Sequence, residues 1–348
     1  MRAVLIESFG EAPRVTDVPD PVPAGHGVVV RVDATGLCRS DWHAWAGHDS
    51  GAPLPLVPGH ELAGTIKAVG ADVSRWRVGQ RVTVPFVCGC GTCDFCRAGD
   101  AQVCPQQTQP GFTGWGSYAD LVALDHADFN LVEVPDGVTQ VAAAALGCRF
   151  ATAYRALVGR ARVQPGEWVA VLGCGGVGLS AVMIATALGA RVIATDPGEQ
   201  ARSLATELGA EVVLDAAAVD VPAQIHDLTD GGTHVALDAV GSERTCADSV
   251  LSLRRRGRQV QVGLLPGVQG HPRVPMERVV AYELDVLGSH GMAAADYPQM
   301  LELVADGRLD PARLVTRTIG LEEAAAELPL LGSRAATGVT VVLPGAGG

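Results

Sequence analysis

Four cysteines lie close together in the pattern C-x2-C-x2-C-x7-C, at Cys90, Cys93, Cys96 and Cys104. Thiolates at this spacing can close a tetrahedral shell around one soft cation, and zinc is the usual occupant because it accepts four sulfurs without redox chemistry. A closed four-sulfur shell leaves no position for a substrate, so this site is expected to be structural. Cys88 precedes the run by two residues, and either Cys88 or Cys90 could supply its first ligand.

A glycine-rich motif farther along the chain indicates a dinucleotide site. Residues 173–178 form a G-x-G-x-x-G that follows an apolar strand predicted at 169–172 and opens a helix predicted at 178–188. The first glycine allows a tight turn, the second lets the backbone approach a pyrophosphate, and the third lets helix and strand pack closely. The amide groups at the helix N-terminus favour phosphates. The predicted cofactor contacts are Gly173, Gly175, Gly176, Val177 and Gly178.

An acidic residue, Asp196, follows the next predicted strand at 191–195. A carboxylate at this position can accept hydrogen bonds from both ribose hydroxyls of NAD, and it would repel the extra phosphate of NADP. Pro197 and Gly198 come next, so no arginine stands immediately beside Asp196 to favour that phosphate. NAD is therefore the predicted cofactor. The alternative is that Asp196 only caps the following helix.

The elements that must position these residues differ between two parts of the chain. Short runs rich in Val, Gly and Pro predict strands in the first part, for example at 28–32 and 63–69, and hence a β-rich domain. From about residue 167 the predicted strands and helices alternate, which implies a parallel sheet covered by helices on both faces. The last predicted elements are a helix at 297–305 and a strand at 338–343.

Composition narrows the class of protein. The chain has 348 residues, 48% of them hydrophobic, which is enough for two domains with separate cores. Its formal net charge of -12 argues against non-specific DNA binding, which needs clustered Lys and Arg. The dense basic run at 254–258 is interpreted as the solvated end of a helix that reaches Arg255, followed by a turn at Gly257.

Compartment and membrane association are also predicted from the sequence. The first residues contain no secretory signal, and the nine cysteines are spaced for metal rather than for disulfides, so a cytoplasmic location is predicted. The uncharged stretch from Trp168 to Ala190 is about as long as a bilayer span. Glycines interrupt that stretch, which is therefore interpreted as a strand, a turn and a buried helix. Neither a membrane nor a nucleic acid is an expected partner.

Five motifs in order resemble the zinc-dependent medium-chain alcohol dehydrogenases over essentially the whole chain. They are Gly36-Leu37-Cys38-Arg39-Ser40-Asp41, Pro58-Gly59-His60-Glu61, the four-cysteine run, Gly147-Cys148 and the glycine motif. The resemblance implies a catalytic zinc with three protein ligands, which leaves one coordination position open. It also favours Cys90 over Cys88 as the first structural ligand. The implied catalytic ligands are Cys38, His60 and Cys148, which spacing alone would not connect.

The resemblance further implies the roles of the residues near that zinc. Ser40 would hydrogen-bond the substrate oxygen, and His43 would pass the proton to solvent through the cofactor ribose. Asp41 would orient the imidazole of His60. Glu61 would be a carboxylate able to approach the zinc when water or product leaves. Another contact, between the cofactor pyrophosphate and the side chain of Arg39, is implied in the same way.

The fold class implied is α/β, with a GroES-like catalytic domain and a Rossmann domain. The expected boundaries are 1–149 with 290–348 for the catalytic domain and 150–289 for the NAD-binding domain, with nicotinamide and catalytic zinc meeting in the cleft between them. The resemblance also implies a homodimer or homotetramer. Two zinc ions per chain, one catalytic and one structural, are expected together with NAD.

The expected reaction is reversible hydride transfer between NAD and a primary or secondary alcohol, with the matching aldehyde or ketone. Polyol and threonine dehydrogenases of this superfamily usually place a carboxylate where Cys148 stands, so they form the rival interpretation on the same scaffold. Rivals from different classes are a non-catalytic zinc-stabilised binding protein and a zinc-ribbon nucleic-acid module. Four aromatic residues could line an apolar substrate slot or equally belong to the core: Trp45, Phe86, Phe112 and Trp115.

Overall fold

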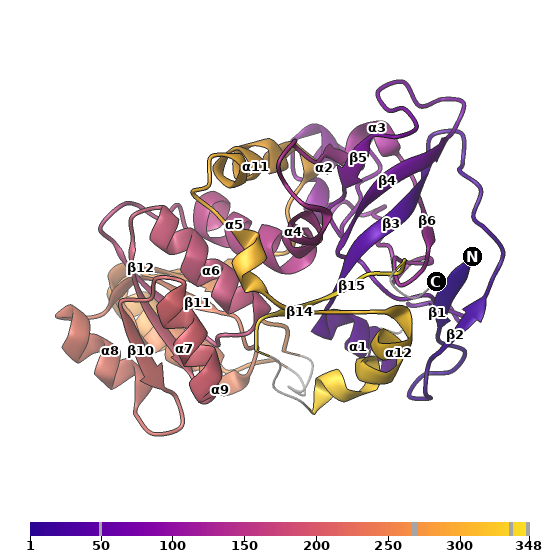
Figure 1. The fold of residues 1–348 in the computed structure, drawn as a ribbon. Coiled ribbons are helices and arrows are strands. Elements are labelled where there is room, and N and C mark those ends of the chain that lie inside the picture. Colours follow the sequence, from indigo (N-terminus) through magenta and orange to yellow (C-terminus); the bar gives the residue numbers. More distant parts are fainter. Residues whose placement is uncertain (49–50, 266–270, 334–336, 346–348) are drawn as a thin grey trace. The chain divides into compact units, whose positions relative to one another are not determined.

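The computed structural model describes residues 1–48, 51–265, 271–333 and 337–345. Figure 1 shows the order of the elements along the chain. The chain divides into two compact units. The first consists of Met1–Ala151 and Gly291–Gly348, and the second of Thr152–His290.

The first unit is built on a β-sheet of β3 (Val28–Leu37), β4 (Leu62–Val69), β5 (Arg81–Thr83), β6 (Leu121–Leu124), β7 (Val132–Glu133), β14 (Val315–Ile319) and β15 (Val339–Val342). The strand order is β14-β15-β3-β4-β5-β7, and β6 also pairs with β3. Only β14 and β15 pair in parallel; the other pairings described are antiparallel. The expected β-rich character of this part is confirmed. A separate antiparallel pair is β1 (Arg2–Leu5) with β2 (Arg14–Asp17).

Alternate residues of the two central strands form the core of this unit. Val28, Val30 and Val32 of β3 are buried beside Leu62 and Ile66 of β4. This follows from the period of two in a strand, which sends every second side chain to the same face. The last strand, β15, pairs with residues 35–37 at the end of β3, directly before Cys38 (Figure 1).

Short helices complete the first unit. The helix α1 begins immediately after β3, and α4 begins at Gln140, where the Thr139 hydroxyl accepts a hydrogen bond of 3.1 Å from the Ala142 amide. Such a cap satisfies one of the amide groups left free at a helix start. The helices are α1 (Arg39–Trp45), α2 (Asp94–Arg97), α3 (Ala127–Asn130), α4 (Gln140–Ala145), α11 (Tyr297–Ala305) and α12 (Leu321–Glu327), with shorter turns η1 (Ala101–Val103), η2 (Leu146–Phe150), η4 (Ala294–Asp296), η5 (Pro311–Leu314) and η6 (Leu328–Gly332).

The second unit is a parallel sheet of β8 (Trp168–Leu172), β9 (Arg191–Asp196), β10 (Val212–Asp215), β11 (Thr233–Asp238), β12 (Leu253–Gln261) and β13 (Asp285–Gly288). The strand order is β10-β9-β8-β11-β12-β13. The chain adds strands outward from β8 on one side and outward from β11 on the other, so the order of strands switches between β8 and β11. This is the Rossmann order 3-2-1-4-5-6, so the doubly wound fold predicted for this part is confirmed. The helical segments of this part are α5 (Ala151–Tyr154), η3 (Arg155–Arg160), α6 (Gly176–Ala187), α7 (Glu199–Glu207), α8 (Val221–Thr229), α9 (Glu243–Leu251) and α10 (Met276–Tyr282).

The basic run at 254–258 is not the end of a helix, and the prediction that a helix reaches Arg255 is wrong. The helix α9 ends at Leu251, and the arginines belong to β12. The pairing of β12 with β11 shifts register here, and Arg256 adopts a positive φ of 62°. A run of charged residues indicates only that the segment is exposed to solvent. An irregular stretch of a strand is exposed as readily as the end of a helix.

One helical stretch passes a length and hydropathy test for a membrane span. It runs over Gln140–Arg160 through α4, η2, α5 and η3, and 78% of its apolar window is buried inside the structure. The stretch from Trp168 to Ala190 forms a strand, a glycine turn and a helix, as predicted.

A surface carboxylate ties α3 to the loop that precedes β5. The Asp128 carboxylate accepts hydrogen bonds from the Ser74 amide (2.9 Å), the Ser74 hydroxyl (2.7 Å) and the Arg75 amide (3.0 Å). Partial burial opposes ionisation, but these bonds and the nearby charge of Arg75 outweigh it and hold the pKa of Asp128 below its ordinary value of 3.8. The ionised carboxylate therefore contributes to stability.

Replacing Asp128 with Asn is expected to lower the free energy of unfolding by about 1 kcal/mol near neutral pH, because charge-assisted hydrogen bonds are lost. Because folding depresses this pKa, the contribution is present above the unfolded value and disappears as the pH falls through the folded value. Urea denaturation should therefore show the difference from wild type shrinking as the pH falls below 3.8. The exposed Asp136→Asn is the matched control, and a difference that does not change with pH would contradict the assignment.

Candidate functional site

The first catalytic motif is positioned by the junction of β3 and α1. Cys38 follows the last residue of β3 and forms the N-cap of α1. Across the sheet, the Gly36 amide donates a hydrogen bond of 2.8 Å to the Glu61 carbonyl, which fixes Cys38 beside the second motif. A Cβ at Gly36 would lie 2.1 Å from Oε2 of Glu61, so only glycine leaves room for that carboxylate. The predicted motif residues are thus brought together by the pairing of β3 and β4.

The fully buried carboxylate of Asp41 organises this site. Its Oδ1 accepts hydrogen bonds from Nδ1 of His60 (2.8 Å) and from the Gly59 amide (3.0 Å). Its Oδ2 accepts from the Cys38 amide (3.1 Å) and the Tyr118 hydroxyl (2.6 Å). Because a carboxylate can only accept, Nδ1 of His60 carries the hydrogen. In the neutral ring, the other nitrogen, Nε2, then carries the lone pair.

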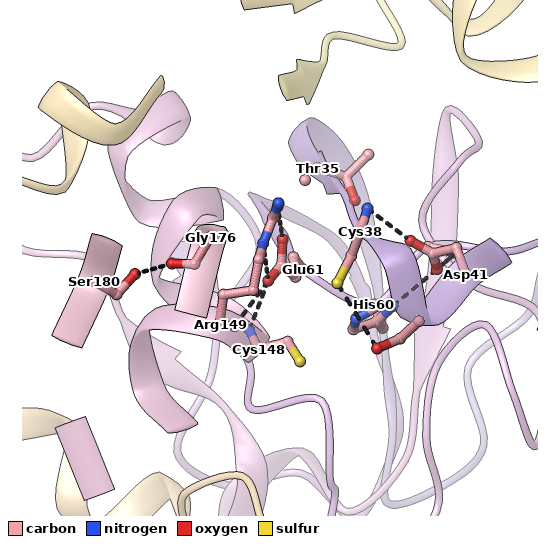
Figure 2. Close-up of polar contacts among 12 residues, drawn as sticks. Thr35, Cys38, Asp41, His60, Glu61, Cys148, Arg149, Gly176 and Ser180 are labelled. Carbon is pink, nitrogen blue, oxygen red and sulfur yellow. Dashed lines mark hydrogen bonds and ion pairs between the residues drawn. The ribbon is translucent and has the colours of Figure 1, made fainter. Parts of the chain in front are cut away.

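That lone pair is buried, and it has no hydrogen-bond partner among the residues that the structure describes. The ligand atoms of Cys38, His60, Glu61 and Cys148 all lie within 4.8 Å of one another. Figure 2 shows the sulfurs of Cys38 and Cys148 close to the His60 ring. An orphaned buried nitrogen is costly, and a soft metal ion beside two thiols would satisfy it. The predicted ligand set therefore fits a zinc ion.

Cys148 enters the site from η2, a π-helical turn between α4 and α5. Such turns are rare and occur frequently at functional sites because they re-aim side chains. Interaction with the Cys148 thiol, together with the charge of Arg149, holds the pKa of Cys38 well below its ordinary range despite complete burial. The same interaction and burial raise the pKa of Cys148. Without a cation, only one of the two sulfurs is readily ionised, whereas a metal ion favours both thiolates.

Glu61 is held by its neighbour in space, Arg149. Oε1 of Glu61 accepts hydrogen bonds from the amides of Cys148 (3.2 Å) and Arg149 (2.9 Å) and from Nε of Arg149 (3.0 Å), and Oε2 accepts from Nη2 of Arg149. Both residues are buried. Burial raises the pKa of Glu61, and the Arg149 charge opposes that rise. Sequence reasoning did not identify Arg149, although its place directly after Cys148 was a signal that a charged residue lies at the site.

The predicted relay residues lie on or next to α1. The Ser40 hydroxyl is half-buried and 3.8 Å from Sγ of Cys38. Nδ1 of His43 is 2.9 Å from Nδ1 of His48. Burial first, and then the charges of His48 and Arg39, lower the pKa of His43, so it is neutral at pH 7. Arg39 is exposed.

The four candidate pocket aromatics separate into two groups. The ring of Phe112 is 5.1 Å from that of His60, and the ring of Phe86 is 6.0 Å from it. Trp45 packs in the same cluster as Phe112. Trp115 instead donates a hydrogen bond to the Pro55 carbonyl and packs against the cluster around Val57. Phe86 and Phe112 thus lie beside the ring of His60, and Trp45 packs with Phe112.

The four-cysteine run forms a second group of potential ligands. The sulfurs of Cys90, Cys93, Cys96 and Cys104 lie within 4.8 Å of one another. Backbone amides point at them, for example that of Gln106 at Sγ of Cys104 (3.3 Å). Such donors stabilise thiolates. The rival first ligand, Cys88, lies outside this group.

Cys88 is part of the hydrophobic core. Its thiol donates to the Pro85 carbonyl, and its backbone pairs with Thr108. Burial, followed by the charge of Asp125, raises the pKa of Cys88 to about 12. Because Cys88 lies in this core and outside the four-sulfur group, the geometry agrees with Cys90 as the first member of that set.

The glycine motif has the local geometry that a pyrophosphate requires. Gly173 has φ of 92°, which favours glycine, and a Cβ at Gly178 would lie 1.7 Å from the Gly173 carbonyl oxygen. Around Gly175, by contrast, no described atom lies within 4 Å of a Cβ built there. Gly176 begins α6, and Val177 is its second residue. The backbone is thus closed where helix meets strand and open where a phosphate would approach.

Asp196 ends β9 beside this turn. Its carboxylate accepts hydrogen bonds from the amides of Cys174 (2.8 Å) and Gly198 (2.7 Å). Arg202 also lies near, where it donates to the Asp196 carbonyl (2.8 Å) and pairs with Asp215 (3.4 Å). The expectation that no arginine immediately follows Asp196 in sequence is right, but α7 brings one back in space.

Comparisons with known proteins agree with both units. Residues 24–136 match the alcohol dehydrogenase GroES-like domain, and residues 176–306 match the zinc-binding dehydrogenase domain. An alcohol dehydrogenase of Geobacillus stearothermophilus is 35% identical over 89% of this chain and 90% of its own length. This chain belongs to the zinc-binding alcohol dehydrogenase family.

Two further relatives of this family cover nearly the whole chain. The NAD-dependent alcohol dehydrogenase of Sulfurisphaera tokodaii is 32% identical over 99% of this chain and 100% of its own length. The crystal structure of the alcohol dehydrogenase from Aeropyrum pernix superposes with a TM-score of 0.89, at 31% identity, and covers 99% of this chain and 100% of that one. The expected membership in the zinc-dependent alcohol dehydrogenases is confirmed.

The four-sulfur assignment can be tested by metal content. Cys93→Ser should lower the zinc content by about one ion per chain and lower the melting temperature, because a structural zinc contributes directly to folding. Cys88→Ala is the matched control and should leave the zinc content unchanged. Elemental analysis of the purified proteins decides: unchanged zinc in the Cys93 variant, or a lost ion in the Cys88 variant, would contradict the assignment.

Proposed function

We propose that the protein is a zinc-dependent, NAD-dependent alcohol dehydrogenase acting on small primary or secondary alcohols and the matching aldehydes or ketones. The observation that carries the proposal is the buried Nε2 of His60, which has no partner in the described part of the chain and faces two cysteine sulfurs. Two sulfurs and one nitrogen, with one open position, form the donor set of a catalytic zinc.

Cys38, His60 and Cys148 would hold the ion. When bound, zinc supplies a Lewis acid that lowers the pKa of an alcohol, and NAD supplies the hydride acceptor. The chain's own contribution is orientation, because Asp41 fixes the ring of His60. Such outer partners typically change metal affinity or activity by about 10- to 100-fold.

The alcohol proton requires a path to solvent, and residues on and after α1 would supply it. We assign the first acceptor to the Ser40 hydroxyl, which lies beside Cys38. His43 is neutral at pH 7 and can therefore receive a proton. Its Nδ1 contacts His48, which is exposed and can release the proton to water. His48 thus extends the relay that the sequence suggested for Ser40 and His43.

The second unit would bind NAD through the glycine turn and Asp196. The open space at Gly175 and the start of α6 suit the pyrophosphate, and Arg39 of the first unit is a candidate for an additional phosphate contact. Asp196 would accept from the ribose hydroxyls. Its own hydrogen bonds with the Cys174 and Gly198 amides hold it in place for that role.

The apolar walls favour alcohols with alkyl or aryl substituents. Phe86 and Phe112 lie against the ring of His60, so an uncharged chain would replace water there at a gain of roughly 25 cal/mol for each Å² buried.

A homodimer or homotetramer in a reducing cytoplasm remains the proposed state. The domain boundaries proposed are 1–149 with 290–348 and 150–289, near the units described above.

Cys148→Ala should abolish NAD-dependent alcohol oxidation, a loss of at least about 10³-fold, because the ion loses one of three ligands. The fold should survive, since alanine replaces only a sulfur in a half-buried position. The matched control is Cys246→Ala, at a buried cysteine in α9. NADH absorbance and circular dichroism measure both effects. Wild-type rates in the Cys148 variant would remove this residue from the site.

Asp196→Asn should weaken NAD binding by about tenfold and strengthen NADP binding, because the charge that repels the extra phosphate is gone. Asparagine keeps the volume but has one acceptor oxygen, so it can accept from only one of the Cys174 and Gly198 amides. Fluorescence titrations with NADH and NADPH give the two dissociation constants. An unchanged ratio between them would mean that Asp196 only caps α7.

A further inference from the structure

The Glu61 carboxylate has two competing partners. One of its oxygens lies within 4.8 Å of the ligand atoms of Cys38, His60 and Cys148, so it is within reach of the same ion. Yet both oxygens already accept hydrogen bonds, from Arg149 and from two backbone amides. Figure 2 shows the Arg149 side chain alongside Glu61. The carboxylate is therefore a potential fourth ligand that is held back.

Charge explains why the arrangement persists. Two thiolates balance the charge of a divalent ion, so a third anion in the first shell would leave this buried site with a net negative charge. Glu61 is 0% exposed and the Arg149 side chain is 10% exposed, so neither charge is solvated by bulk water. Removing one partner of such a pair leaves the charge of the other buried and uncompensated, which favours contact with another opposite charge. For Glu61, the nearest available counter-charge would be the metal.

The geometry of the pair also matters. Arg149 presents Nε and Nη2 to the two oxygens of Glu61, a fork that matches a carboxylate, while the amides of Cys148 and Arg149 add two more donors to Oε1. A lysine would bring the charge without the fork. Since Arg149 follows Cys148 directly, the π-helical turn that aims the sulfur at the ion aims the guanidinium at Glu61.

We propose that Arg149 is a positioning residue that clamps Glu61 away from the metal and thereby keeps the fourth coordination position open for substrate. The proposal rests on the proposed function, because it needs an ion among Cys38, His60 and Cys148. It goes beyond that function because it explains why the fourth coordination position is open. The reason is a specific side chain, Arg149, and not the three ligands alone. Without this clamp, Glu61 would compete with the substrate for the fourth coordination position.

The test uses the full-length protein loaded with Co²⁺ and titrated with imidazole in the absence of NAD. Imidazole changes the visible spectrum only of an ion that has an exchangeable position, so the closed four-sulfur site does not contribute to the change. In Arg149→Met, Glu61 is expected to fill that position and weaken imidazole binding by about tenfold or more. In the double variant Arg149→Met/Glu61→Gln, affinity should return to near the wild-type value.

Controls separate this role from loss of structure. Arg258→Met removes another partly buried ion pair, that with Glu167 in the second unit, and should leave imidazole binding unchanged. If Arg149→Met does not fold, Arg149→Lys and Arg149→Lys/Glu61→Gln give the same comparison with the charge retained. Wild-type affinity in the single variant, or weak binding that Glu61→Gln does not restore, would overturn the proposal. A wild-type protein whose cobalt spectrum ignores imidazole would instead overturn the proposed function.

Discussion

The hydrogen bond between Nδ1 of His60 and the Asp41 carboxylate is the interaction on which the site depends. It fixes the tautomer of the imidazole, and the other nitrogen is thereby left as a buried lone pair. Asp41 can do this because Tyr118 and the Cys38 and Gly59 amides occupy its remaining acceptor positions and prevent it from turning. A buried lone pair without a donor is unfavourable in the folded chain alone, and metal binding relieves that cost.

The same balance of charge extends outward from the ligands. Two sulfurs offset the ion, Arg149 offsets Glu61, and the half-buried His43 stays neutral beside Arg39 and His48. The buried charges of Glu61 and Arg149 thus compensate each other. A neutral environment of this kind suits the binding of a neutral alcohol.

Much of this arrangement follows from the sequence because its motifs carry their own geometry. Gly178 must be glycine where helix and strand touch, and the spacing of Cys90, Cys93 and Cys96 allows one ion to meet all three. The parallel sheet followed from the alternation of apolar runs and helices. These features are local, so a short window of residues is enough to predict them.

Other features depend on contacts between distant residues, and sequence patterns did not reveal them. Arg149 and Glu61 are 88 positions apart, and His48 reaches His43 only because α1 ends between them. Arg202 returns to Asp196 through one turn of α7. The basic run at 254–258 was assigned to a helix because exposure is common to helices and irregular strands. In all four cases the outcome depends on contacts that form only in the folded chain.

The central claim is that Nε2 of His60 shares an open-coordinated zinc ion with the sulfurs of Cys38 and Cys148. Anomalous diffraction at the zinc absorption edge, from crystals of the protein as purified, tests this most directly. The account predicts two peaks for each chain, one among the four sulfurs of the run and one bounded by these three atoms. A single peak confined to the four-sulfur group, or a second ion bonded elsewhere, would contradict it.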